Sequence, residues 1–158
     1  MNITTLFLEL LRFIPLLTVM GYAAYSDYKT GEVSNKVWRY IIIGGLITSL
    51  ETAFFFSIPL LIINLAVIAV SVVLGFLMFK LGGGGADSKA FMTIGVSAPL
   101  FPLWSFLWPF PLPIVVLFIA CVLALPALIF RNSDVPFLKR KIRFLPFMFI
   151  GLIFSLIL

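Results

Sequence analysis

The 158-residue sequence contains no histidine and a single cysteine, Cys121. Without histidine, the chain cannot form a Ser-His or Cys-His nucleophile, a His-ligated zinc protease site or a histidine proton relay. With one cysteine, an internal disulfide and a CxxC zinc site are also excluded. Any chemistry of this protein must therefore use other polar side chains.

Charge is scarce as well. Only 11% of the residues are charged, whereas soluble domains are nearer one quarter. Hydrophobic residues make up 63% of the chain, and the mean hydropathy is +1.23. This composition indicates an integral membrane protein. Because the apolar residues form long runs rather than an alternating pattern, we expect an all-α fold, with residues 1–158 forming one polytopic domain.

The apolar runs predict six transmembrane helices, each of about 20 residues or somewhat fewer. Glu9 and Arg12 interrupt the first run, so the chain start is not typical of a cleavable signal peptide and is interpreted as a first span with a polar entry. A break between the second and third spans is expected around residues 51–59, where Glu51, Ser57 and Pro59 cluster. The predicted spans cover residues 6–25, 40–79 (two spans), 90–108, 114–130 and a short stretch ending at 158.

Three polar stretches form the first, third and fifth connections between these spans, so all three are expected on one side of the membrane. They contain or adjoin ten of the eleven basic residues, with Arg12 the exception. By the positive-inside rule this side is cytoplasmic, and both termini are extracytoplasmic. The basic balance thus predicts a multi-pass plasma-membrane protein that contacts anionic lipid, and not a nucleic-acid partner. Trp38 and Trp108 lie at predicted span ends, as interfacial aromatic residues do.

The third connection contains the most unusual stretch, four consecutive glycines at 82–85 followed by Asp87 and Lys89. Each glycine costs a helix about 1 kcal/mol relative to alanine, but allows another backbone to approach closely. One interpretation is a hinge with Asp87 as the N-cap of the next helix. The other is a functional site, because Asp27 ends the first span and Asp87 opens the fourth at the same predicted depth.

Two carboxylates that share one proton can activate water: the ionised member takes a proton from the water, and the protonated member polarises a carbonyl. At ~4 Å and an effective dielectric of ~20, their charges repel by about 4 kcal/mol, so the pair would titrate as a unit. From the residues alone, ordinary helix caps or a cation site remain alternatives to this pair.

The run Gly84-Gly85-Ala86-Asp87, followed by Ser88-Lys89, resembles the GxGD-x-K signature of type IV prepilin peptidases, a family that includes archaeal preflagellin peptidases. Ala86 stands where the signature has its second glycine. This is a small steric change, although alanine does not favour a positive φ as glycine does.

Asp27, six residues before Val33-Ser34-Asn35, resembles the first motif of the same family, an aspartate six residues before Ile-Pro-Asn. Val33 replaces isoleucine, and Ser34 replaces proline, which permits a different turn after Asp27. The resemblance covers about residues 26–89. Both motifs occur in order and on one predicted face, which is more specific than either motif alone.

The resemblance implies a membrane aspartyl endopeptidase that removes the short basic leader of prepilin-like or preflagellin-like precursors at the cytoplasmic face. It implies neither a cofactor nor a metal. The CxxC…CxxC region of the larger, N-methylating members is missing, so the chain is similar to the short, peptidase-only members. The implied catalytic residues are Asp27 and Asp87, and the implied supporting residues are Asn35, Gly84, Gly85, Ala86 and Lys89.

Three other functions are weighed against this one. A small transporter or channel could use the same aspartates for a cation or protons, but neither is predicted near the membrane midplane. A non-catalytic assembly partner would tolerate Asp→Asn changes at both positions. A GxGD protease that cuts within a span would carry a different first motif and more spans.

Overall fold

A computed structural model describes residues 3–81, 84–100, 110–130 and 143–157 of the chain. These residues form six helices; the described ranges contain no strand beyond an isolated bridge between Leu100 and Pro111. The all-helical fold predicted from the sequence is confirmed. The helices are α1 (Ile3–Thr30), α2 (Asn35–Phe56), α3 (Ile58–Lys80), α4 (Gly85–Ser97), α5 (Leu112–Phe130) and α6 (Leu145–Ile157).

Local sequence explains where the first helices end. Gly31, with φ of 75°, follows α1, and its N–H donates to the Asp27 carbonyl at 2.9 Å. This is the left-handed glycine cap that commonly ends a helix. Ser57 separates α2 from α3, and its hydroxyl accepts a hydrogen bond from the Leu60 N–H at 3.4 Å. Pro59 lies in the first turn of α3, where a proline costs no hydrogen bond. The break predicted for residues 51–59 is therefore confirmed.

Helix α4 differs from its predicted span. It begins at Gly85, five residues before the expected start, and ends at Ser97, so the prediction of a continuous span to Trp108 is wrong. Pro99 explains the early end, because a proline disfavours helical geometry in the residue before it. Ala98 accordingly has φ of −146° and ψ of 73°. Residues 101–109, with Trp104 and Trp108, lie outside the described residues.

In the part of the chain that the structure describes, one helix, α3, is long and apolar enough to cross a membrane by length and composition. Helix α4 has 13 residues, and so has α6. At 1.5 Å per residue each is about 20 Å long. The six predicted spans and the sidedness of the termini therefore stay predictions.

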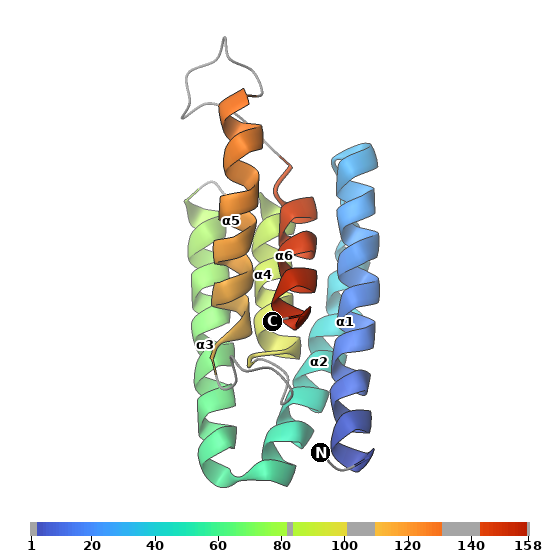
Figure 1. Cartoon of the computed structure of the whole chain (residues 1–158), viewed down its shortest axis with the longest axis vertical. Helices are drawn as coiled ribbons and strands as arrows, with labels where there is room; N and C mark the ends of the chain where they lie inside the picture. The colour runs from blue at the N-terminus through green and yellow to red at the C-terminus, as the bar shows by residue number, and fades with distance from the viewer. Residues whose placement is uncertain (1–2, 82–83, 101–109, 131–142, 158) are drawn as a thin grey trace.

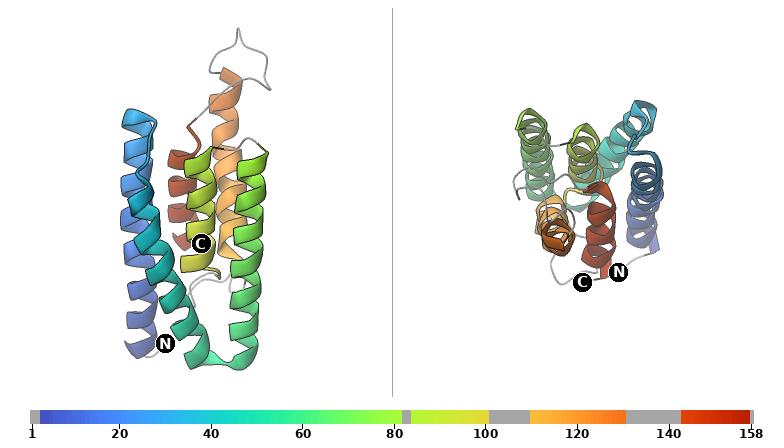
Figure 2. Two further views of the ribbon diagram at one scale, coloured as in Figure 1. Left: turned by 180° about the vertical axis from the view of Figure 1, so that it is seen from behind. Right: turned by 90° about the horizontal axis from the view of Figure 1, so that it is seen from above.

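Helix α4 is the centre of the bundle (Figures 1 and 2). It packs chiefly against α2 and α3, while α1 packs against α2 and α6, and α5 packs against α6. Small residues allow the close approach on two sides. A Cβ at Gly95 would lie 2.1 Å from the Ser71 Cβ of α3, and one at Gly45 of α2 would lie 2.5 Å from the Ser97 Cβ. These glycines let α4, and the residues at its start, sit inside the bundle.

The ends of α1, α3 and α5 and the starts of α2, α4 and α6 lie at one end of the bundle (Figure 1). We call this the polar end; its described part includes the last turn of α1, the first turns of α2 and α4, and Arg143. The N-terminus lies at the opposite end. The prediction that the polar connections share one side is consistent with this arrangement.

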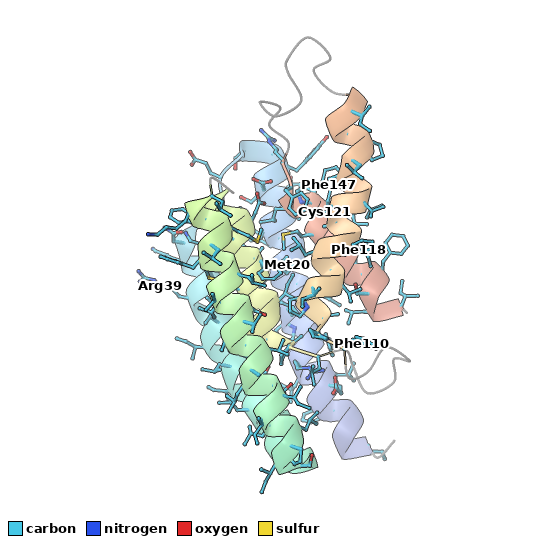
Figure 3. The ribbon with its side chains drawn as sticks, turned by 90° about the vertical axis from the view of Figure 1, so that its left-hand side faces the viewer. Met20, Arg39, Phe110, Phe118, Cys121 and Phe147 are labelled. Atoms are coloured by element: carbon cyan, nitrogen blue, oxygen red, sulfur yellow. The ribbon has the colours of Figure 1, made fainter. Side chains whose placement is uncertain are left out.

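The outer surface of the bundle is strongly apolar. Large aliphatic and aromatic side chains are exposed along α3 and α5, and Phe118 of α5 points away from the bundle (Figure 3). Trp38 of α2 behaves differently from the expectation for an interfacial residue. Its side chain is 2% exposed and packs in the core, so that prediction is wrong. Its place at a predicted span end gave no information about which way the ring points.

Candidate active site

Asp27 lies in the last turn of α1 and is buried, with 8% of its surface exposed. Its Oδ2 atom has no hydrogen-bond partner within the described structure. Burial raises the pKa of Asp27, because it penalises the charged form, and the charge of Arg143 opposes that rise. A buried carboxylate oxygen without a partner is costly, and it is available to bind a water molecule or a substrate.

Asp87 is the third residue of α4 and is half-buried. Burial is the larger cause that raises its pKa to about 6, and the negative charge of Asp27 is the second. The structure thus brings together two aspartates that are 60 residues apart in the sequence, at the polar end, close enough for one charge to act on the other. The alternative interpretation, in which Asp87 is the N-cap of α4, is wrong. Gly84 occupies that position, without a side-chain cap hydrogen bond.

The glycines before Asp87 have unequal roles. A Cβ at Gly84 would lie 2.7 Å from Oδ2 of Asp87, so a larger residue would displace the carboxylate. A Cβ at Gly85 would meet only the Phe79 ring, at an ordinary 3.6 Å. Ala86, the departure from the family signature, is half-buried and packs against the hydrophobic core. The position of the Asp87 carboxylate therefore requires glycine at 84, whereas the packing at position 86 accommodates the methyl group of alanine.

The two motifs touch through a pair of residues other than the aspartates. Lys89 of α4 donates a hydrogen bond from Nζ to Oδ1 of Asn35, the first residue of α2. This bond joins positions 54 residues apart, and each lies in a motif with one of the aspartates. Their contact ties the start of α2 to the start of α4, and the supporting role expected for Lys89 and Asn35 stays a prediction.

The departure at Ser34 also has a local explanation. Its hydroxyl accepts a long hydrogen bond, 3.4 Å, from the Lys36 N–H, and its carbonyl accepts one from Val37 at 3.2 Å. Ser34 therefore acts as the N-cap of α2, a position that serine favours. Val33 is half-buried against the core. The turn after Asp27 is further fixed by the Ser26 hydroxyl, which donates to the Glu32 carbonyl at 2.8 Å.

Arg143 is a site residue that sequence reasoning missed. It lies two residues before α6, donates from Nη1 to the Tyr28 carbonyl, and its charge acts on Asp27. In the sequence it is one of many basic residues that indicate sidedness, and the only signal was its place as the last of them before the final apolar run.

The comparisons with known proteins bear on the same residues. The family model of the type IV leader peptidases matches residues 14–129, which include Asp27, Asp87 and both motifs. The chain belongs to the type IV leader peptidase family. Arg143 and α6 lie beyond the matched residues.

Two relatives of the chain are named preflagellin peptidases. The chain is 30% identical to the one of Methanococcus voltae over 142 residues, which cover 82% of the chain and 61% of that relative. It is also 30% identical to the one of Methanocaldococcus jannaschii over 131 residues, which cover 75% of the chain and 56% of that relative. The chain thus spans less than two thirds of the length of these relatives.

Of the other acidic side chains that the structure describes, neither Glu32 nor Glu9 joins the pair. Glu32 is exposed in the turn after α1, and Asp134 lies outside the described residues. Glu9 pairs with Arg12 in the N-terminal half of α1, toward the opposite end from the polar end. Within the described ranges, no three His, Cys, Asp or Glu side chains are grouped as a metal site would require.

Proposed function

We propose that this protein is a membrane aspartyl endopeptidase that removes the basic leader of prepilin-like or preflagellin-like precursors, with Asp27 and Asp87 as its catalytic pair. The observation that carries the proposal is the pair itself. Two carboxylates from α1 and α4 lie at one end of the bundle, and burial and the charge of Asp27 raise the pKa of Asp87 to about 6. Such a pair holds one proton over the pH range where water must be activated.

The reaction follows from the unequal surroundings of the two groups. Arg143 favours the ionised form of Asp27, whereas burial and the neighbouring charge favour the protonated form of Asp87. Asp27 takes a proton from a water molecule, whose oxygen attacks the scissile carbonyl carbon, while Asp87 gives its proton to the carbonyl oxygen. When the tetrahedral intermediate collapses, the C–N bond breaks, the proton held by Asp27 passes to the leaving amine, and Asp87 takes back a proton from a hydroxyl of the intermediate, which becomes the new carboxyl group.

We place the protein across the plasma membrane as six helices, with the catalytic pair at the cytoplasmic face and both termini on the other side. The exposed apolar side chains of α3 and α5 support this placement, because a soluble protein rarely exposes so continuous an apolar surface. Basic residues gathered in and beside the polar connections support the cytoplasmic assignment. In this placement, membrane lipid surrounds the exposed apolar side chains of the bundle.

The substrate proposal rests on chemistry and on the relatives. A leader peptide ends just before an apolar segment, so the bond to be cut lies at the membrane surface, where the pair is placed. The two relatives are named preflagellin peptidases, which favours a precursor of that kind. We expect no N-methyltransferase activity, since the cysteine-rich region of the methylating members is missing from this sequence.

The test is cleavage of a tagged preflagellin-like precursor in membranes by the wild type, Asp27→Asn and Asp87→Asn. Each substitution keeps the size of the side chain and removes the proton exchange. We expect each variant to lose at least about 10³-fold in cleavage rate, as a catalytic group acting in a unit does. Glu32→Gln is the matched control, because Glu32 is an exposed carboxylate in the turn after α1. Undiminished cleavage by either Asp→Asn variant, at wild-type expression, would refute the catalytic pair.

A further inference from the structure

We propose that Arg143 is a positioning residue that fastens the Asp27-bearing turn of α1 to the start of α6 and keeps Asp27 as the ionised member of the pair. The inference rests on the proposed function, since it assigns the roles of base and acid within that site. It adds a residue from outside both sequence motifs and outside the matched family region.

The last turn of α1 leaves a carbonyl for Arg143 to bind. In the left-handed glycine cap, the Gly31 N–H satisfies the Asp27 carbonyl, and the carbonyls that follow have no partner within the helix. Nη1 of Arg143 donates to the next of them, the carbonyl of Tyr28. The guanidinium thus completes the cap of α1 from a residue 115 positions later, at the negative end of the helix dipole.

Gly31 lies beside this contact. Its φ of 75° is the left-handed conformation that favours glycine, and a Cβ there would lie 3.5 Å from Nη2 of Arg143. The guanidinium therefore packs against the turn as well as binding its carbonyl. Arginine suits this place better than lysine, because its planar fork donates in fixed directions.

The charges around Asp27 single out Arg143 as the cation that acts on it. Among the described residues, two charges act on the pair from another part of the chain: that of Arg143 acts on Asp27, and that of Asp27 acts on Asp87. Lys89 is bound to Asn35, and Lys29 lies over the Tyr25 ring at 5.8 Å. The other charged residues at this end, on the turn after α1, on α2 and on α3, are exposed: Glu32, Lys36, Arg39 and Lys80.

The consequence is that the two aspartates have different roles, with Asp27 as the base and Asp87 as the acid. Burial alone raises the pKa of both carboxylates, which leaves open which one gives up its proton first. Arg143 acts on Asp27 and so makes that residue the base. Because the same guanidinium also holds the backbone beside Asp27, losing it changes both the protonation and the placement of the base.

The experiment is the pH profile of precursor cleavage by the full chain in membranes, for wild type, Arg143→Gln, Arg143→Lys and Arg39→Gln. With Arg143→Gln we expect the acidic limb to move up by about one pH unit, with cleavage at pH 6 roughly tenfold lower and partly recovered at higher pH. Arg143→Lys keeps the charge and is expected to keep the wild-type limb, with a lower maximal rate. Arg39 is exposed and points away from the bundle (Figure 3), so Arg39→Gln is expected to match the wild type.

An unshifted limb with wild-type rate in Arg143→Gln would overturn the inference. So would a limb shifted equally in Arg143→Gln and Arg39→Gln, because the effect would then be general to the removal of a positive charge. If Arg143→Gln does not accumulate as folded protein, Arg143→Lys decides: a wild-type maximal rate contradicts the positioning role. The catalytic proposal is judged separately by Asp27→Asn and Asp87→Asn, so a failure here leaves that result intact.

Discussion

Two regions of this bundle bury charge in different ways. Toward the N-terminal end, Glu9 and Arg12 of α1 form an ion pair of 2.6 Å, with side chains 1% and 3% exposed. At the polar end, Asp27 and Asp87 are both acidic, come from two helices, and leave Oδ2 of Asp27 without a partner in the described structure. The first pair lies three residues apart in one helix and neutralises itself. The second is held together against its own repulsion by the packing of α1 and α4, as expected for a site kept for function rather than stability.

The largest expected effect comes from breaking the ion pair. Arg12→Met leaves Glu9 buried without its partner, which we expect to cost about 3–5 kcal/mol of unfolding free energy, measured by denaturation in detergent micelles. The double variant Glu9→Leu/Arg12→Met should recover most of this loss. Cleavage per folded molecule should stay within twofold of wild type, because Arg12 is 15 residues, or roughly 22 Å along the helix, from Asp27. A loss of cleavage in a double variant that is well folded would show that the Glu9–Arg12 pair and the Asp27–Asp87 pair are coupled.

A smaller effect is expected from the glycines beside the aspartate pair. Gly84→Ala places a Cβ 2.7 Å from Oδ2 of Asp87 and must displace that carboxylate. We expect cleavage to fall at least about tenfold, since catalysis depends on placement to within an ångström. Gly85→Ala is the matched control, because its Cβ meets the Phe79 ring at an ordinary 3.6 Å. Equal rates for the two variants in the precursor assay would contradict this distinction.

The smallest effect is on how stability depends on pH. The pKa of Asp87 is raised from 3.8 to about 6, so the folded state keeps a proton that the unfolded chain has already lost. Stability therefore falls as the pH rises from about 4 through 6. Asp87→Asn removes this loss, and its Tm should exceed that of wild type by a few degrees at pH 8, with less difference at pH 5.

Glu32→Gln is the control for that measurement. Glu32 is exposed, and its substitution changes the net charge by the same amount as Asp87→Asn. A Tm for Asp87→Asn that follows the wild type at both pH values would show that Asp87 is not strained by burial and repulsion. We expect Asp87→Asn to be more stable than the wild type and to have lost cleavage, so that this one residue lowers stability and is required for activity.

The sequence alone determined the helical class, a break within residues 51–59, and the residues of both motifs, because each depends on local composition or spacing. It also placed Asp27 and Asp87 at one end of the bundle, since alternating helices bring odd-numbered connections to the same side. Where a local signal competed with the apolar pattern, the sequence prediction was wrong. Pro99 ended α4 at Ser97, although apolar residues continue beyond it.

Only the tertiary structure decided which side chains meet across helices. The Lys89–Asn35 bond, the contact of Arg143 with the turn after Asp27, the crowding at Gly84 and the burial of Trp38 all depend on how each helix is rotated about its axis. A helix that is apolar on every face carries no hydrophobic pattern to show which side points inward. In this chain, composition therefore determined that the helices form, and the close packing of small residues around α4 determined how they face one another.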